Sequence, residues 1–335
     1  MTPVRGDLSP DGGRYYDSAD WGWQPLWLSA GQVVEACRES FGLPARSAEL
    51  LTGGLLNQSW RVRADDHDRV LRVGRPERDL DQVRYEYRLA AAWAEEIPQV
   101  IVAEHAPGHR AGDHLLTLFR FVDGVDGSQV RAATRNRQLA PVMARMHRIA
   151  VDLGLPQRPG YRSIDEQPMS AHWGRVRSAI VDRFGATAEV GEPASAVDRA
   201  VDQLDQQLDG WRSAGRLDHR AAVHGDLNTR NQLYRNGRLV GIIDIDECRV
   251  EPLIWEVAGM AYTDPSVDPQ AVWRQYLDAG GPLPPEDGEM LESFARLGAL
   301  GELQWFLDDE GKATHLALDK LWTLAAELGT APVRG

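Results

Sequence analysis

The stretch "VHGDLNTRNQLYRNGRLVGIIDIDE", residues 223–247, constrains the fold more than any other part of the sequence. The segment "AAVHGDL" predicts a short buried strand that leads into a polar loop. The segments "NQLYR" and "RLVGIID" flank Asn236-Gly237, a dipeptide typical of a type I′ turn, and so predict a β-hairpin. This hairpin places Asp226 and Asn231 on one loop and Asp244 at the end of the returning strand, so we expect the three side chains to lie close together.

These three side chains have the chemistry that phosphoryl transfer requires. Two carboxylates and an amide oxygen form a hard-oxygen site of the kind that Mg²⁺ prefers, and the spare carboxylate can accept a proton from a hydroxyl. The spacing His-x-Asp-Leu-x-x-x-Asn, followed by Ile-Asp, is filled without a gap by His224, Asp226, Leu227 and Asn231, with Asp244 at the metal-binding position. The alternative is an ordinary polar loop, but a turn needs one or two such residues and not the whole set.

Composition and charge exclude several classes of protein. A chain of 335 residues is long enough for two domains, and its net charge of -13 argues against a general nucleic-acid binder. Two cysteines, Cys37 and Cys248, are too few for a disulfide framework or a zinc site, which favours a reducing compartment. We find no signal peptide and no apolar run of membrane-spanning length, so the expected location is the cytoplasm. The first lysine is Lys312, so a cation needed before it must be an arginine.

Periodicity predicts an α+β chain in three parts. Residues 1–27 form a Trp-containing arm of open role, residues 28–122 form a first lobe, and residues 123–335 form a larger part that contains the hairpin. The lobe contains a helix over 28–42 and a five-stranded antiparallel sheet with one helix. Three strands lie within 48–75, a helix opened by Pro76 covers 76–96, and the last two strands are 99–106 and 114–122. From Gln167 on, the pattern outside the hairpin is mostly helical.

The motif "HGDLNTRN" with "GIIDID" resembles the aminoglycoside phosphotransferase and choline kinase family, small-molecule kinases with a bilobal, protein-kinase-like fold. Gly225 follows the histidine, as in the small-molecule branch, whereas protein kinases usually have arginine there. The resemblance runs from Ser47 to the end of the motif region. It implies that residues 28–122 are the nucleotide-binding lobe and that residues 123–335 hold the catalytic loop, the metal site and the substrate-binding helices. It implies that Asp226 is the catalytic base, that Asn231 and Asp244 bind Mg²⁺, and that His224 supports the loop. Glu256 stands where the family usually has an aspartate that braces the loop, and we expect it to be structural.

The amino-terminal half offers the remaining nucleotide-binding groups. By the same resemblance, "TGGLLNQSW" forms the turn over the phosphates, and Arg72 with its flanking Leu71 and Val73 provides the phosphate cation. Glu86 is expected to hold that cation. The connection after the fifth strand is expected to contact the adenine edge. The predicted nucleotide-binding residues are Gly53, Gly54, Asn57, Gln58, Ser59, Arg72, Glu86, Phe119, Phe121 and Val122.

The acceptor pocket in this family is built from the helical part after the metal aspartate. The candidate residues there are Asp246, Trp255, Tyr262, Asp264, Trp305, Asp308, Asp309 and Glu310. "QWFLDDEG" would present carboxylates to a cationic acceptor such as an amino sugar, although acids near a helix end are commonly only solvated. His147 in "MARMHRIA" is expected to pack or to cap.

These observations predict an enzyme that uses ATP, or GTP, with Mg²⁺ to transfer the γ-phosphoryl group to a hydroxyl of a small molecule. An antibiotic or other natural product is the first expectation, which would make the protein a resistance enzyme. A metabolite kinase of the homoserine, choline or sugar type is the alternative. A nucleotide-binding pseudokinase with a regulatory role is the alternative from another class. We expect a monomer or a homodimer that binds neither nucleic acid nor a membrane.

Overall fold

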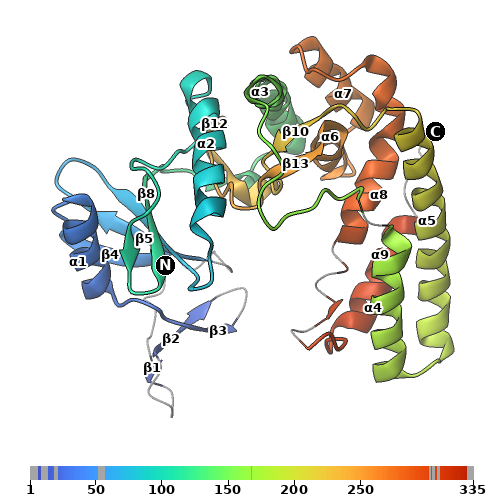
Figure 1. Cartoon of the computed structure of the whole chain (residues 1–335), viewed down its shortest axis with the longest axis horizontal. Helices are drawn as coiled ribbons and strands as arrows, with labels where there is room; N and C mark the ends of the chain where they lie inside the picture. Colours follow the sequence, from blue (N-terminus) through green and yellow to red (C-terminus); the bar gives the residue numbers. More distant parts are fainter. Residues whose placement is uncertain are drawn as a thin grey trace. The chain divides into compact units, whose positions relative to one another are not determined.

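The computed structural model describes residues 7–8, 14–18, 22–51, 57–166, 168–301, 303, 306–307 and 310–329. By its internal contacts the chain divides into two compact units (Figure 1). The first consists of Met1–Asp126 and Gln232–Asp246, and the second of Gly127–Asn231 and Glu247–Gly335. The predicted hairpin therefore packs with the first unit. The domain limits at residues 27 and 122 remain predictions.

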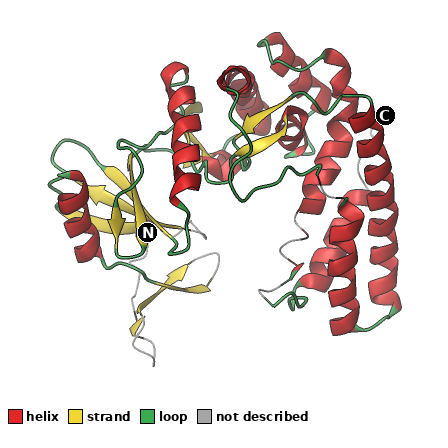
Figure 2. Ribbon diagram, in the orientation of Figure 1, coloured by secondary structure: helices red, strands yellow, loops and turns green. Residues whose placement is uncertain are grey.

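The first unit contains the predicted five-stranded antiparallel sheet, whose strands are drawn in yellow in Figure 2. The strand order is β4-β5-β6-β8-β7. Its strands are β4 (Ser47–Leu51), β5 (Asn57–Arg63), β6 (Arg69–Gly74), β7 (Arg110–Ala111) and β8 (His114–Arg120). The strand predicted over 99–106 is wrong: that stretch makes only single bridges, Val100 to Ile242 and Ala103 to Phe119. The fifth strand is β7, which the hairpin turn at Gly112-Asp113 pairs with β8.

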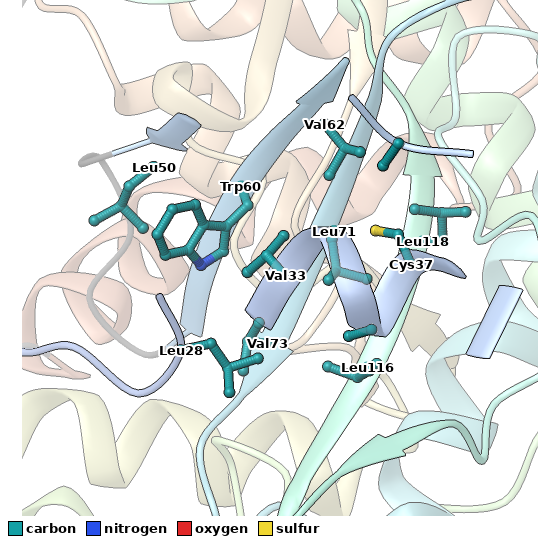
Figure 3. Packing of buried hydrophobic residues seen from close by; sticks show 12 residues of the cluster. Leu28, Val33, Cys37, Leu50, Trp60, Val62, Leu71, Val73, Leu116 and Leu118 are labelled. Carbon is teal, nitrogen blue, oxygen red and sulfur yellow. The ribbon is translucent and has the colours of Figure 1, made fainter. Parts of the chain in front are cut away.

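Helix α1 (Ala30–Phe41) covers one face of this sheet, as Figure 3 shows. The predicted caps are confirmed: Ser29 forms a capping box with Gln32, and Gly42 ends the helix with a φ of 63°. Val33 and Cys37 of the helix pack against every second residue of the strands, that is, against the side chains on one face of the sheet. The members of that sheet face are Trp60, Val62, Leu71, Val73, Leu116 and Leu118.

Helix α2 (Leu80–Glu96) lies on the opposite face. It begins at Leu80 with Asp79 as its N-cap, and not at Pro76 as the sequence suggested. Arg72 and Phe119 are the strand neighbours of Leu71 and Leu118, so their side chains lie on the other face of the sheet. There they line a cavity together with Val83 of α2. The sheet therefore presents Arg72 toward α2, as its apolar flanking residues predicted.

The predicted hairpin is confirmed. It consists of β11 (Gln232–Arg235) and β12 (Arg238–Ile242), and its turn residues Asn236 and Gly237 have φ values of 52° and 73°. Strand β9 (Val125–Asp126) pairs with β11 in the first unit. The arm contributes a separate three-stranded sheet of β1 (Asp7–Leu8), β2 (Arg14–Ser18) and β3 (Gly22–Pro25).

The second unit is mostly helical, as predicted. Its helices are α3 (Ala132–Leu153), α4 (Met169–Phe184), α5 (Ala188–Ser213), α6 (Leu253–Tyr262), α7 (Pro269–Asp278), α8 (Leu291–Gly301) and α9 (Ala317–Gly329). Helix α5 packs on α4 and α9, α6 on α8, and α3 on α7. The strands β10 (Arg220–Val223) and β13 (Arg249–Pro252) form an antiparallel pair, and the short 3₁₀ helices are η1 (Gly127–Gln129), η2 (Thr229–Asn231) and η3 (Pro285–Met290). Within the described ranges, no helix has both the length and the apolar character needed to cross a bilayer.

Candidate active site

The loop that follows β10 is fixed by a close approach of two backbone segments in the second unit. Strand β10 is buried, and His224 at its end is completely buried. Gly225 has a φ of 84°, and a Cβ placed on it would lie 2.1 Å from the carbonyl oxygen of Glu247. Only glycine allows this backbone path. The position at which the sequence departs from protein kinases is thus one where a side chain has no room.

Asp226 is held by two side-chain amides of its own loop. Asn231 Nδ2 donates to Asp226 Oδ2 at 2.9 Å and to the Asp226 carbonyl at 2.8 Å, and Asn228 Nδ2 donates to Asp226 Oδ1 at 2.7 Å. The carboxylate is half-buried, so it is oriented and still accessible. Both Asn231 side-chain bonds are made by its nitrogen, which points its amide oxygen away from Asp226 and leaves that oxygen as a possible cation ligand.

A buried polar chain supports this loop from three helices. The Gly225 N–H donates to Glu256 Oε1 at 3.0 Å. Glu256 Oε2 accepts from His147 Nε2 at 3.0 Å, and His147 Nδ1 lies 2.9 Å from the Tyr276 hydroxyl. Glu256 thus braces the loop, as expected from its position, and His147 has a polar role beyond packing.

The pKa of Glu256 follows from these contacts. Burial alone would raise it, but the hydrogen bond from His147, the charges of His147 and His224, and the Gly225 N–H together hold the pKa of Glu256 below its ordinary value. Burial and the nearby Glu256 charge raise the pKa of Tyr276. Glu256 is therefore ionised at neutral pH and charge-assists its bond to the loop.

The first unit contains the other predicted metal ligand, Asp244, which follows β12. Its Oδ1 accepts from Arg72 Nη2 at 2.6 Å, and the Arg72 guanidinium lies over the Phe119 ring at 5.2 Å. The Asp244 side chain is 36% exposed, so a cation could approach it. Its backbone has a φ of 66°, a conformation that costs a non-glycine residue about 1–2 kcal/mol.

Glu86 pairs with Arg78 and not with Arg72, which corrects the pairing expected from the sequence. Arg78 Nη2 contacts both Glu86 oxygens, at 2.6 and 2.7 Å. Arg78 Nη1 donates to Asn57 Oδ1 at 2.9 Å and to Asp246 Oδ2 at 3.2 Å. Asn57 Nδ2 donates to Asp246 Oδ2 at 2.8 Å, so the amide predicted to face phosphate is part of this cluster.

The cluster is electrostatically self-consistent. Burial would raise the pKa of Asp246, but the charges of Arg72 and Arg78 and the hydrogen bonds from its neighbours lower it below the ordinary range. Burial would lower the pKa of Arg78, yet Glu86 and Asp246 raise it. Asp246 and Arg78 are therefore both charged at neutral pH. Asp246, predicted as a substrate residue, is an internal partner of Arg78.

A small cavity adjoins these groups. Arg72, Glu86, Phe119 and Asp244 line it together with apolar residues of α2, and its volume is about 30 Å³. That volume holds about one water molecule and is far too small for a nucleotide.

The remaining predicted nucleotide residues are placed as follows. Ser59 lies opposite Arg72 in the β5–β6 register. Gln58 binds the backbone of Pro25 and Trp27 and so ties the arm to the sheet. The Phe121 N–H donates to Asp68 O at 3.1 Å, and Val122 is half-buried. Gly53 and Gly54 lie outside the described residues.

Apart from Asp246, the predicted acceptor residues that the structure describes lie on or after α6. The Arg249 guanidinium stacks on the Trp255 ring at 4.8 Å. Tyr262 and Asp264 line a cavity of about 1030 Å³ formed by the ends of α6 and α9 with α8. Glu310 pairs with Lys312 on the surface. Trp305, Asp308 and Asp309 lie outside the described residues.

Sequence reasoning missed Arg78. It lies in the connection between β6 and α2, where no periodicity applies, and its partners are 21, 8 and 168 positions away. The only signal available was the acidic residue at Glu86 on the buried side of an amphipathic helix, which required a cation.

Comparisons with known proteins agree with this architecture. The model of the phosphotransferase enzyme family (APH) matches residues 47–292. A search of curated protein sequences finds no significant match. Among solved structures, an aminopropanol kinase associated with a microcompartment is 20% identical, with a TM-score of 0.66 over 91% of this chain and 99% of that one.

Two antibiotic kinases are also similar in structure. A spectinomycin phosphotransferase in complex with ADP and spectinomycin is 14% identical, with a TM-score of 0.60, and the match covers 91% of this chain and 99% of that one. The macrolide 2′-phosphotransferase of Brachybacterium faecium is 18% identical, with a TM-score of 0.56 over 90% and 98% of the two chains. These structures share the protein-kinase-like fold predicted from the motif. With the family match over residues 47–292, the chain belongs to the phosphotransferase enzyme family and is a small-molecule phosphotransferase that acts on a hydroxyl group.

Proposed function

We propose that this chain transfers the γ-phosphoryl group of ATP, with Mg²⁺, to a hydroxyl of a small-molecule natural product such as an antibiotic. The observation that carries the proposal is the geometry around Asp226: a half-buried carboxylate, oriented by Asn228 and Asn231, on a loop braced by ionised Glu256. A loop that served only structure would not need an accessible oriented carboxylate.

In this proposal Asp226 aligns the acceptor hydroxyl and accepts its proton as the phosphoryl group is transferred. The Asn228 and Asn231 amides fix the direction in which the carboxylate presents its lone pairs, so most of the rate comes from positioning. Arg72 contributes its guanidinium to the α- and β-phosphates as a bidentate donor.

The two predicted metal ligands, one in each unit, each have the chemistry that magnesium prefers. The amide oxygen of Asn231 and the exposed carboxylate of Asp244 are hard oxygen ligands. Mg²⁺ bound by them would neutralise charge on the phosphates. Nucleotide binding is supported by the spectinomycin phosphotransferase, whose structure contains ADP.

A large cavity of the second unit, at the ends of α6 and α9 beside α8, has room for an acceptor of natural-product size. Its volume of about 1030 Å³ lies at the upper end of the range for small-molecule sites. Its lining contains Asp264, Asp268, Glu292 and Glu327 against one basic residue, Arg296, which already pairs with Glu292. This charge favours an acceptor with amino groups.

A metabolite kinase is the second candidate, supported by the similarity to an aminopropanol kinase. One experiment separates the two. The purified chain is incubated with Mg²⁺ and ATP or GTP against a panel of amino-sugar antibiotics, macrolides, choline, homoserine and amino alcohols, and the phosphorylated product is detected by ³¹P NMR. The proposal expects an amino-group-bearing antibiotic to give the highest kcat/KM.

The same assay tests Asp226. We expect Asp226→Asn to lower kcat by about 100- to 10,000-fold, because the amide cannot accept the proton, while the melting temperature stays close to that of the wild type. Wild-type turnover in this variant would remove Asp226 as the base. Asn228→Ala serves as a comparison, since it removes one orienting bond and retains the carboxylate.

A further inference from the structure

One buried arginine contacts three parts of the first unit, including the segment after β12 that carries Asp244. Arg78 comes from the β6–α2 connection, Glu86 from α2, Asn57 from the start of β5, and Asp246 from the segment after β12. The side chains of Arg78 and Asp246 are each 9% exposed, and that of Glu86 is 12% exposed. Three side chains, 8, 21 and 168 positions away in sequence, therefore meet at the Arg78 guanidinium.

We propose that Arg78 is a positioning residue, which holds Asp244 and α2 in the arrangement that the metal-bound nucleotide requires. This inference rests on the proposed function. Arg78 clamps Asp246, which lies two positions after Asp244. Arg78 also donates to both carboxylate oxygens of Glu86, and Glu86 does not form an ion pair with Arg72. Arg72 then has Asp244 as its ion-pair partner and is able to turn toward phosphate.

The charged groups of the first unit support these separate roles of Arg72 and Arg78. Two guanidinium groups, Arg72 and Arg78, stand among three carboxylates, those of Glu86, Asp244 and Asp246. Arg78 and the Asn57 amide donate hydrogen bonds to the buried Asp246 carboxylate. Asp244, in contrast, is 36% exposed and has a strained backbone. Asp246 is thus the anchor of the segment, and Asp244 is the group it presents.

The contact geometry requires an arginine. One nitrogen of the fork contacts both oxygens of Glu86 while the other contacts Asn57 and Asp246. A lysine keeps the charge but has a single ammonium, which cannot reach both sets of partners at once. Arg78→Lys is therefore the informative variant, because it separates the positioning geometry from the charge.

The test measures the affinity of the full chain for ADP by calorimetry, once with saturating Mg²⁺ and once with EDTA. The ratio of the two dissociation constants is the gain due to the metal. We expect Arg78→Lys to reduce this gain by about 10- to 100-fold, as is typical when a residue that orients a metal ligand is changed. A residue that only stabilises the fold would lower the melting temperature and leave the ratio unchanged.

Arg84→Lys is the matched control, since Arg84 lies on α2, close to Arg78 in sequence, is 57% exposed and pairs only with Asp81 among described residues. Its metal gain and melting temperature are expected to equal those of the wild type. If Arg78→Lys fails to fold, Asp246→Asn tests the same contact from its other side and is expected to show the same loss. If folded Arg78→Lys keeps the wild-type ratio of the two dissociation constants, or if Arg84→Lys lowers that ratio equally, the inference is wrong and the proposed function stands. If Mg²⁺ does not increase the affinity of the wild-type protein for ADP, the proposed function is wrong as well.

Discussion

At the scale of single residues, two backbone positions beside the proposed chemical groups tolerate few side chains. Gly225 precedes Asp226 and is enclosed by the Glu247 carbonyl. Asp244 is one of two non-glycine residues with positive φ in the described part of the chain; the other, Asn236, is explained by its type I′ turn. The strain at Asp244 has no such local reason, and its bond to Arg72 helps to hold it. Strain at a ligand position is common at functional sites.

We expect Gly225→Ala to destabilise the protein by about 3 kcal/mol or more, because the new Cβ would overlap the Glu247 carbonyl and the left-handed φ is unfavourable. Urea unfolding measures the loss. The matched control is Gly210→Ala in α5, where nothing lies within 4 Å of the added methyl. Alanine in a helix interior is expected to stabilise by about 0.5–1 kcal/mol there. Equal effects of the two changes would contradict the close approach.

At the scale of elements, local signals predicted what local contacts determine. Asn236-Gly237 indicated the hairpin because its turn type depends on those two residues alone. The strand expected over 99–106 was wrong because its apolar residues are buried by tertiary contacts, with the Ile101 N–H bound to Ile242 O, and not by a ladder. Likewise, motif spacing identified Asp226 and Asn231, which share a loop. It could not identify the Arg78–Glu86 pair, because Arg78 also depends on a segment 168 positions away.

The loop brace between α3, α6 and α7 predicts a pH dependence. The folded state lowers the pKa of Glu256, so its ionised form stabilises the fold above the unfolded pKa near 4.5. This contribution is lost as the pH falls through the lower, folded-state pKa. Glu256→Gln is expected to destabilise by about 1.5–3 kcal/mol at pH 7, through loss of the charge-assisted bonds. The difference from wild type stays constant between pH 7 and 5 and shrinks below about 4.5. Urea unfolding at several pH values tests this, and a difference that grows in acid would contradict it.

At the scale of the whole molecule, the division into units does not follow the order of the chain. Residues 232–246 return to the first unit after more than a hundred residues in the second. They supply the β11 partner of β9, the Ile242 backbone bonds to Gln99 and Ile101, and the Asp246 anchor of Arg78. A contact-based unit is thus built from two sequence segments, which a linear domain boundary at residue 122 cannot express.

This architecture predicts how fragments behave. The fragment 1–126 retains the five-stranded sheet but loses the β9 partner and leaves Arg78 with one carboxylate fewer. We expect it to unfold at low urea without a sharp transition.

Because Asp126 lies opposite Leu233 in an antiparallel pair, a short Asn-Gly turn can join residue 126 to residue 232 without strain. The fusion of 1–126 with 232–246 through such a turn is expected to unfold cooperatively, as followed by circular dichroism. The same fusion carrying Asp246→Ala is the control and is expected to lose part of that stability, since Arg78 would keep its charge without its second carboxylate. A fragment 1–126 as cooperative as the fusion would show that the returning segment is not needed for the folding of the first unit.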